Sequence, residues 1–524
     1  MRPILLALMI LMSAAAYPSG GNDGTAGLTI GGEYRYDALE YSGEKKHFVR
    51  DMAALDLSGK TSIAFSHLYV QESDLHRWTW NFNSAGLIPG GEIYAGHYYL
   101  SFGTGLVMGM NDGRESDPFS LRKIAAGRDF YRPCLTGNPS SAFYGGLAKY
   151  SREIAGINIS CAPFFSYRER YITYDYRDKD PVRYRTLARH LDRKNVRYEP
   201  VYLSDAGIFG SAALKNFFIQ AYFIYSGTQN EDRRPVPIAP SEGPLNEIIR
   251  YYALGVFAQY RDDYIRIYAE IDAPFADSTG KTKAGSPAVV AGAKITHRSL
   301  DVFFNTTWCG TSYFSLHGSP SITTGTTWQC GFTVRPARGF SAGFSCSSEK
   351  ENRPGRGERL PRSVRREQVF CGWKRNRKAE LSLRGGRVEE DGTGQEKKLQ
   401  AKIGLKFTVN DVFSFTVSGV YQSRGGEHSG SCPVKLDFSE RRIFRASVYY
   451  SPYFIDGKNL VYARVLPVRD AVSPGLFIRD DSHIAAVQAG VSYRSLKISA
   501  RYQVQFVENR VVSHQAEARA ENTF

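Results

Sequence analysis

Residues 496–506 have the sequence LKISARYQVQF, in which apolar and polar side chains alternate one by one. Successive side chains of a β-strand point to opposite faces, whereas apolar residues on a helix recur every three or four positions. The alternation therefore predicts a strand with one apolar and one polar face. The polar face of this strand consists of Lys497, Ser499, Arg501, Gln503 and Gln505.

The same period of two recurs along the chain, for example in residues 265–272, 399–407 and 413–421. These segments run to about ten residues, the length that a tilted strand needs to cross the hydrocarbon core of a membrane. Strands of soluble sandwiches are shorter, typically about five or six residues. The pattern predicts an all-β fold, and the strand length predicts a transmembrane β-barrel.

Short and long connections alternate between these segments. Outer-membrane barrels show this alternation, because tight turns join the strands at one end and long loops join them at the other. Counted back from the C-terminus, the pattern predicts a large antiparallel barrel of about 24 strands, within a range of about 20 to 26. The predicted short turns are near residues 262–263, 298–299, 338–339, 410–411 and 494–495. The predicted long connections are residues 273–286, 310–325, 347–363, 423–440 and 469–481.

The N-terminus has the features of an export signal. Arg2 provides a positive charge, residues 4–12 are apolar, and small residues precede a predicted cleavage site. We therefore expect a signal peptide at residues 1–16, a short segment at 17–27 and a barrel at 28–524, located in the bacterial outer membrane.

The composition agrees with a barrel. The chain of 524 residues contains 33 Tyr and 31 Phe, and aromatic residues form girdles at both membrane interfaces of a barrel. The mean hydropathy of -0.35 is low because a polar inner face dilutes an apolar outer face. No run of about eighteen apolar residues follows the signal, as a membrane-spanning helix would require. The alternative architecture, a soluble β-propeller or an array of sandwiches, would need fewer Lys, Arg and Gln at alternating positions.

The last alternating segment ends in Phe524, with Ala516, Ala518 and Ala520 in the same phase. A chain that ends in Phe after an alternating strand resembles the signal that the barrel assembly machinery of the outer membrane recognises. We expect that machinery to be a partner of the chain.

The seven cysteines cannot all pair within one chain, because their number is odd. Four of them share the apolar phase of their segments, and we expect these to behave as small apolar side chains. They are Cys161, Cys330, Cys346 and Cys371.

Residues 96–108 have the sequence GHYYLSFGTGLVM. This stretch resembles the G-x-Y-x-L-x-F-G-x-G-L segment of a group of bacterial envelope proteins, and residues 132–148 are similar to the continuation of that segment. Members of the group carry a barrel region, often behind helix-hairpin-helix repeats similar to the competence DNA-binding protein ComEA. The resemblance implies a barrel and, for members with those repeats, contact with DNA. We find no helix-hairpin-helix pattern in residues 17–60.

The chain is strongly basic, with a net charge of +15 and a pI of about 9.3. Positive loops and a positive lumen attract anions such as the phosphates of lipopolysaccharide. We expect outer-membrane lipid, lipopolysaccharide and anionic solutes as partners, and nucleic acid is a further candidate. The predicted anion-attracting residues are Arg353, Arg356, Arg359, Arg362, Arg365 and Arg366 of one loop and strand region, and Lys402, Lys406, Lys497 and Arg501 of polar strand faces.

The sequence offers little for catalysis. The histidines are scattered without H-E-x-x-H spacing, and no C-x-x-C pair is present. We therefore expect no catalytic residues, no cofactor and no metal site, and a chain that is not an enzyme. The predicted function is a pore or conduit whose basic lumen and loops favour anionic solutes. The alternatives are a non-conducting surface scaffold or adhesin, and a barrel associated with DNA uptake.

Overall fold

The computed structural model describes most of the strands and tight turns of the chain. Residues 1–26, which include the expected signal peptide, lie outside the described residues, as do residues 103–108 of the stretch that resembles the envelope proteins. The described residues are 27–39, 44–57, 61–70, 75–85, 87, 89–100, 102, 131–133, 142–174, 185–188, 198–230, 235, 248–278, 281–311, 313, 325–351, 363–375, 378–391, 396–410, 412–440, 443–456, 461–463, 476–478, 481–493, 496–508 and 510–523.

The described residues form thirty strands, and no helix among them is long and apolar enough to cross a membrane. The first fifteen strands are β1 (Gly27–Leu39), β2 (Glu44–Leu57), β3 (Thr61–Val70), β4 (Leu75–Ala85), β5 (Gly91–Leu100), β6 (Tyr131–Pro133), β7 (Phe143–Ile154), β8 (Ile157–Tyr174), β9 (Arg185–Ala188), β10 (Tyr198–Leu214), β11 (Phe217–Gln229), β12 (Arg250–Arg261), β13 (Ile265–Ser278), β14 (Lys281–Ala284) and β15 (Ala288–Thr296). The others are β16 (Leu300–Cys309), β17 (Gly325–Val334), β18 (Phe340–Glu351), β19 (Ser363–Arg375), β20 (Ala379–Asp391), β21 (Glu396–Thr408), β22 (Phe413–Arg424), β23 (Glu427–Ser431), β24 (Val434–Glu440), β25 (Phe444–Ile455), β26 (Val461–Ala463), β27 (Leu476–Ile478), β28 (Ser482–Tyr493), β29 (Leu496–Val507) and β30 (Arg510–Thr523).

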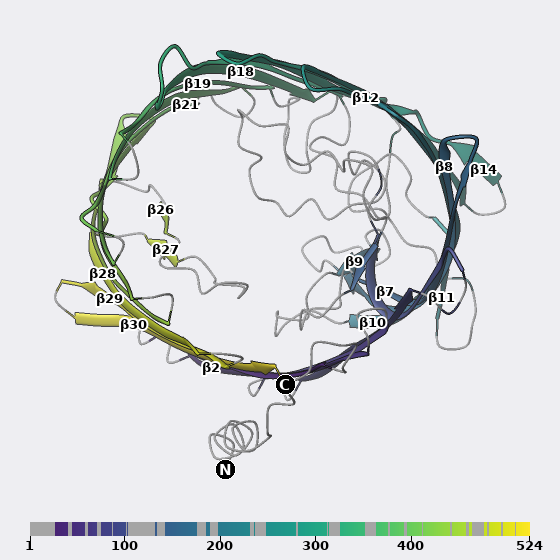
Figure 1. Cartoon of the computed structure of the whole chain (residues 1–524), viewed down its shortest axis with the longest axis horizontal. Coiled ribbons are helices and arrows are strands. Elements are labelled where there is room, and N and C mark those ends of the chain that lie inside the picture. Colours follow the sequence, from purple (N-terminus) through teal and green to yellow (C-terminus); the bar gives the residue numbers. More distant parts are fainter. Residues whose placement is uncertain are drawn as a thin grey trace.

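Twenty-eight of the thirty strands belong to one antiparallel sheet that closes into a ring (Figure 1). The other two, β26 and β27, pair with each other in a separate sheet. The ring closes because β30 pairs with β1, in a register that sets Thr523 opposite Thr29 and Ser513 opposite Leu39. Of the 28 strands in this sheet, β6, β9 and β14 each pair with a single neighbour, which leaves 25 around the ring. Of these 25, β23 and β24 share one place between β22 and β25. The described ring therefore has 24 strand positions, which confirms the predicted count.

Tight turns close one end of the ring at residues 262–263, 298–299 and 338–339, as the sequence predicts. In the other two predicted turns, residues 411 and 494–495 lie outside the described residues. In the turn between β12 and β13, the carboxylate of Asp262 accepts hydrogen bonds from the backbone N–H groups of Ile265 and Tyr264, at 2.6 and 2.7 Å. These two donors stabilise the carboxylate and lower the pKa of Asp262. Asn410 accepts the same pair of bonds in the turn between β21 and β22. Such side-chain bonds fix the geometry of a hairpin turn.

Two predicted loops, residues 273–286 and 423–440, are wrong. In the first, β13 extends to Ser278 and pairs with β14 (Lys281–Ala284). The second loop also contains strands. In the structure β22 extends to Arg424, and β23 and β24 occupy most of the rest. Gly425 and Gly426 have positive φ angles of 59° and 91°, so two residues are enough to reverse the chain. Pro433, which cannot donate to the strand ladder, separates β23 from β24. The proline divides the alternating pattern into two pieces that are each too short to predict a membrane strand.

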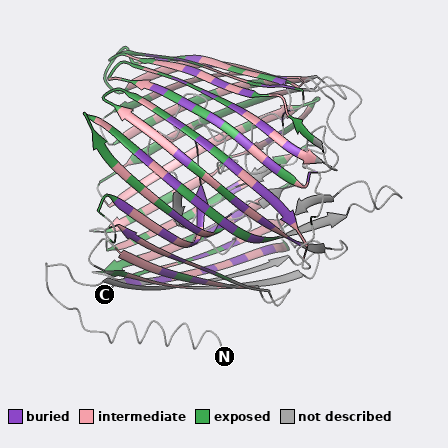
Figure 2. Cartoon of the chain, turned by 90° about the vertical axis from the view of Figure 1, so that its right-hand side faces the viewer, coloured by how far each residue is buried: buried purple, intermediate pink, exposed green. Residues whose placement is uncertain are grey.

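The outward face of the wall is apolar. In β21, for example, Leu399, Ile403 and Phe407 are 51%, 46% and 47% exposed, and their even spacing of four residues puts them on one face of the strand. Figure 2 shows the same alternation as bands along the strands. An apolar belt of this extent is costly in water and favourable in hydrocarbon, and a closed ring leaves no unpaired strand edge there. The chain is therefore an all-β transmembrane barrel, as the sequence predicts.

A charge on the outward face tests this assignment. Replacing Ile403 by Lys places an ammonium group near the middle of β21, where lipid exposure costs about 2–4 kcal/mol. We expect the free energy of unfolding, measured by urea titration of the barrel in lipid vesicles, to fall by about that amount. The matched control, Ser418→Lys on the inward face of β22, should cost less than about 1 kcal/mol. Equal losses in the two variants would contradict the assignment of the faces.

Candidate functional site

The inward face of the wall consists of two unlike arcs. From β5 to β16 it is largely apolar and aromatic, and Phe209 and Tyr251 are fully buried on it. Residues of the long connections pack against this arc. The ring centroid of Phe102, which follows β5, lies 4.1 Å from that of Tyr222 on β11, and Tyr313, which follows β16, belongs to the same buried cluster. The described parts of these connections therefore lie inside the ring.

Buried polar pairs accompany this packing. Asp272 on β13 exposes no surface and accepts a hydrogen bond of 2.5 Å from the hydroxyl group of Tyr222. Tyr313 is a second hydrogen-bond partner of the same carboxylate. Elsewhere in the arc, Arg168 Nε lies 3.1 Å from Asp205 Oδ2. Buried carboxylates need such partners, because an unpaired charge in a water-poor site is strongly destabilising.

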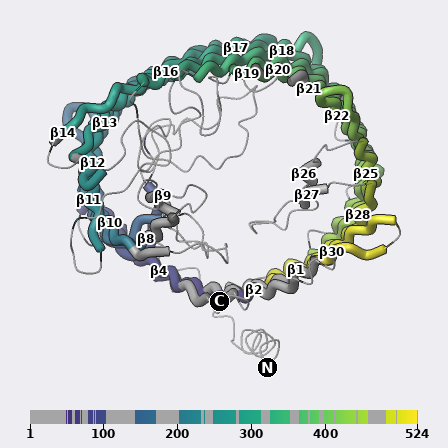
Figure 3. Tube along the Cα trace, turned by 180° about the vertical axis from the view of Figure 1, so that it is seen from behind, coloured from purple at the N-terminus to yellow at the C-terminus, as the bar shows by residue number. Residues whose placement is uncertain are grey.

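Figure 3 shows β19 to β22 side by side in one arc of the ring. The strand register makes the inward face of this arc cationic. The face is identified by the exposed apolar residues, which occupy the alternate, outward positions of the same strands. Among the described residues, the register places seven Lys and Arg on this face and three Glu. The cations are Arg366, Lys374, Arg384, Lys398, Lys402, Lys406 and Arg424, and the carboxylates are Glu380, Glu390 and Glu396.

Two cations meet at the centre of this arc. Arg384 on β20 is directly opposite Lys402 on β21, and both side chains are exposed. Within the described part of the chain, neither forms an ion pair with a carboxylate. Lys406 is opposite Glu380, but that carboxylate also lies 3.9 Å from the Nζ atom of Lys374. One carboxylate, Glu380, thus lies beside two cations, and Arg384 and Lys402 form no ion pair with the described carboxylates. The face therefore keeps a positive charge.

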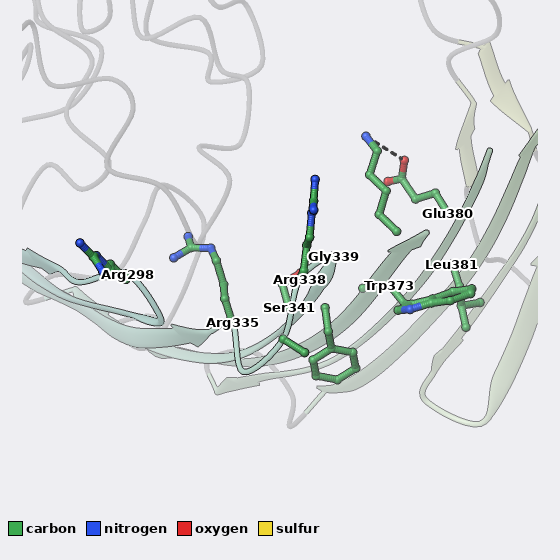
Figure 4. A pocket seen from close by; sticks show the side chains of 12 residues that line it. Arg298, Arg335, Arg338, Gly339, Ser341, Trp373, Glu380 and Leu381 are labelled. Atoms are coloured by element: carbon green, nitrogen blue, oxygen red, sulfur yellow. Dashed lines mark ion pairs between the residues drawn. The ribbon is translucent and has the colours of Figure 1, made fainter. Parts of the chain in front are cut away.

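A cavity of about 520 Å³ lies at the short-turn end of the barrel, beside this arc (Figure 4). Its cations are Arg298 from the turn after β15, Arg335 and Arg338 from the turn after β17, and Lys374. Arg335 donates a hydrogen bond of 2.6 Å to Asp301, and this bond raises the pKa of the guanidinium. Figure 4 shows Arg335 and Arg338 on the same side of the wall. The cationic arc therefore has a cationic rim at this end.

The structure separates the predicted arginine cluster. Arg365 lies on the outward face of β19 and pairs with Glu367 at 2.7 Å, whereas Arg366 lies on the inward face and pairs with Glu349 at 3.1 Å. The two arginines lie close in sequence but on different faces, because successive residues of a strand point to opposite faces. Their attraction for anions stays a prediction. The other four members, outside the described residues, are Arg353, Arg356, Arg359 and Arg362.

The four predicted cations of the polar strand faces all lie on inward faces. Lys402, Lys406 and Lys497 are exposed there. Arg501 on β29 differs, because its guanidinium lies 3.0 Å from Glu517 on β30 and the two side chains are only 1% and 2% exposed. The prediction that Arg501 contributes to a positive lining is therefore wrong, since a buried carboxylate neutralises it.

The stretch that resembles the envelope proteins contributes to the packed arc. Tyr98, Leu100 and Phe102 occupy alternate positions and are all buried in its apolar cluster. Gly96 has a φ angle of 100°, and a Cβ atom there would lie 2.2 Å from the carbonyl oxygen of Trp80. Only glycine fits at such a contact. In its described part, this stretch is a packing element of the inner wall.

Residues 339–343 match the G-x-S-x-G pattern, which in hydrolases marks a nucleophilic serine between a strand and a helix. In this chain the pattern leads from a turn into strand β18, and Gly339 provides the turn with a φ angle of 81°. No histidine is among the described residues that line the cavity beside Ser341. Across the described chain, no group of three or more His, Cys, Asp or Glu is placed to hold a metal ion. In this chain the G-x-S-x-G match is therefore a turn followed by a strand.

The pair of Arg501 and Glu517 yields a stability prediction. Arg501→Gln leaves a buried carboxylate without its cation, a change that costs about 3–5 kcal/mol. We expect the free energy of unfolding in vesicles to fall by that amount, and the ion selectivity to stay unchanged. Lys497→Gln, at an exposed inward position of the same strand, is the control and should cost less than about 0.5 kcal/mol. If Arg501→Gln unfolds as the control does, the pair does not stabilise the barrel.

Comparisons with known proteins show the fold. No family model matches the chain, and no curated protein matches it in sequence. The siderophore receptor PirA from Pseudomonas aeruginosa is 9% identical, with a TM-score of 0.51 over 96% of this chain and 81% of the receptor. A mutant of the ferric enterobactin receptor from the same organism is 8% identical, with a TM-score of 0.50 over 96% of this chain and 82% of that one. The translocation pore of the P pilus usher PapC is 9% identical, with a TM-score of 0.44, over 95% of this chain and all of the pore. The chain therefore has the fold of large outer-membrane β-barrels.

Proposed function

We propose that the chain is an outer-membrane conduit whose cationic inner arc favours anionic solutes. The observation that supports this proposal most strongly is the excess of Lys and Arg over Glu on the inward face from β19 to β22. The barrels of similar fold include receptors for siderophores, so passage of a solute fits a barrel of this size. An inner wall is also the surface that selects ions in channels, through rings or rows of charged side chains.

The spacing of the cations suits permeation. Lys398, Lys402 and Lys406 follow one another at every fourth residue of β21, which is a step of about 13 Å along a strand. In a wet lumen each charge attracts an anion at 4 Å by only about 1 kcal/mol. Such weak, repeated attraction lets a solute enter and still leave, as conduction requires. The cationic rim at Arg298 and Arg338 would collect anions at the short-turn end.

The packed arc favours a second function, a barrel that displays its loops and conducts nothing. Phe102 and Tyr313 occupy space inside the ring and pack on its wall. If the connections fill the lumen, the chain is a scaffold or adhesin and the cations of β21 have no solute to select. Conductance separates the two functions, because a filled barrel passes no current.

The conduit predicts a selectivity that depends on the lysines of β21. Reconstituted in a planar bilayer under a KCl gradient, the wild-type barrel should conduct and favour chloride over potassium. The double variant Lys402→Gln/Lys406→Gln should lower the chloride-to-potassium permeability ratio by about five-fold or more, because about 1 kcal/mol corresponds to a factor of about five. That is the size expected when removed charges act at the high effective dielectric constant of a wet lumen.

The matched control removes two lysines from positions off the inner arc. Lys283 lies on β14, which projects outside the ring in Figure 1, and Lys350 lies on the outward face of β18. Lys283→Gln/Lys350→Gln should leave the permeability ratio as it is in the wild type. Absence of any current, or equal shifts in the two double variants, would contradict the conduit.

A further inference from the structure

Two cysteines meet on the outward face of the wall. The register of β17 and β18 sets Cys330 directly opposite Cys346, and the two Sγ atoms lie 3.2 Å apart. The other cysteines on the outward face lack such a partner: Cys371 on β19 is opposite Ala342 and Leu383, and Cys161 on β8 is opposite Gly210 and Tyr150. Among the described cysteines, the strand register therefore opposes only Cys330 and Cys346.

The pair lies where the outward face changes from apolar to polar. Towards the short-turn end, the next opposed residues are Phe332 and Phe344, whose ring centroids are 6.3 Å apart. Towards the long-loop end, Trp328 is opposite Ser348, and the charged Lys350 follows on the same face. Tryptophan gathers at the level of the lipid head groups. The two thiols thus lie at the margin of the hydrocarbon belt, within reach of an oxidant dissolved in water.

Strand pairing holds the two residues at a separation that suits a covalent bond. Opposed positions of antiparallel strands keep their Cβ atoms about 4.5–5.5 Å apart. A disulfide needs Cα atoms about 4.4–6.8 Å apart, a range that opposed residues meet. A disulfide also needs Cβ atoms about 3.5–4.5 Å apart. With the sulfur atoms already at 3.2 Å, side-chain rotation and a small approach of the two strands bring them to bonding distance.

We propose that Cys330 and Cys346 form a cross-strand disulfide that joins β17 to β18. In this step the two thiols together lose two protons and two electrons, and one S–S bond forms between their sulfur atoms. A disulfide oxidant accepts the electrons and protons and is itself reduced to two thiols. Oxidants of this class act in the envelope compartments that exported proteins enter.

The bond would secure the hairpin that carries part of the cationic rim. The two cysteines are 16 residues apart, and the turn between them contains Arg335 and Arg338. A disulfide stabilises mainly by restricting the unfolded chain. A bond here would also keep β17 and β18 joined when other parts of the barrel open locally. This role is independent of the conduit and would serve a scaffold equally well.

The test uses the full-length protein extracted from outer membranes. Free thiols are blocked with N-ethylmaleimide in denaturant, and disulfides are then reduced and labelled with a second reagent of different mass. We expect Cys330 and Cys346 to carry the second label. Cys161 and Cys371, which share the outward face but have no opposed cysteine, should carry N-ethylmaleimide and serve as internal controls.

Trypsin provides an independent readout, because it cleaves after Arg338, between the two cysteines. Without reduction, fragments 299–338 and 339–350 should stay linked, with a mass two hydrogens below their sum. Fragment ions must assign the sulfur, since Cys309 lies in the same fragment as Cys330. In Cys330→Ser the link should vanish, and Cys346 should carry the first label.

Two results would overturn the disulfide. One is N-ethylmaleimide on both Cys330 and Cys346 in the extracted protein, and again after the refolded barrel has been incubated with oxidised glutathione. The other is a link from Cys346 to Cys309 or Cys371, which would show that the opposed register does not direct the pairing. Both results can be read from the wild-type protein, so a variant that fails to fold leaves the test intact.

Discussion

The structure depends on one constraint, which is that every backbone N–H and C=O group inside hydrocarbon needs a partner within the protein. A closed antiparallel ring meets this constraint, and the eleven opposed positions of β1 and β30 complete it. Once the backbone is arranged in this way, the side chains of each strand alternate between lipid and the interior. The period of two in the sequence is therefore a direct consequence of the pairing of backbone groups.

The outward face contacts lipid and must be apolar, but the inward face need not be. Its side chains differ between two arcs of the ring. On the arc from β5 to β16, the wall and the connections form a packed, largely apolar core with buried ion pairs. On the arc from β19 to β22, exposed Lys and Arg exceed Glu. A ring of 24 strand positions is wide enough to contain both the packed arc and the cationic arc. Packed connections and a charged pathway are therefore compatible in one barrel.

Alternation along the sequence is a local property, and it predicts the strands, the turns and the face of each residue. The identity of a residue's partner is not local. Arg501 meets Glu517, and Cys330 meets Cys346, only because of the register between strands, which the period of two does not specify. The neutralised arginine and the opposed thiols could therefore be seen only in the structure. The strands on either side of Pro433 are missed for a different reason. The proline interrupts the alternation of apolar and polar residues, so each alternating piece is too short to predict a membrane strand.

The most direct test of the lipid-facing wall is the accessibility of spin labels along β21 in lipid vesicles. Labels are attached one at a time at positions 399–407, in a background without the native cysteines, and each is exposed to oxygen or to a nickel chelate. Oxygen concentrates in hydrocarbon, and the chelate stays in water. We predict two opposite oscillations with a period of two. Oxygen maxima should fall at Leu399, Ala401, Ile403, Leu405 and Phe407, and chelate maxima at Gln400, Lys402, Gly404 and Lys406. Accessibilities that rise and fall together, or that repeat every three or four residues, would contradict a wall with one lipid face and one aqueous face.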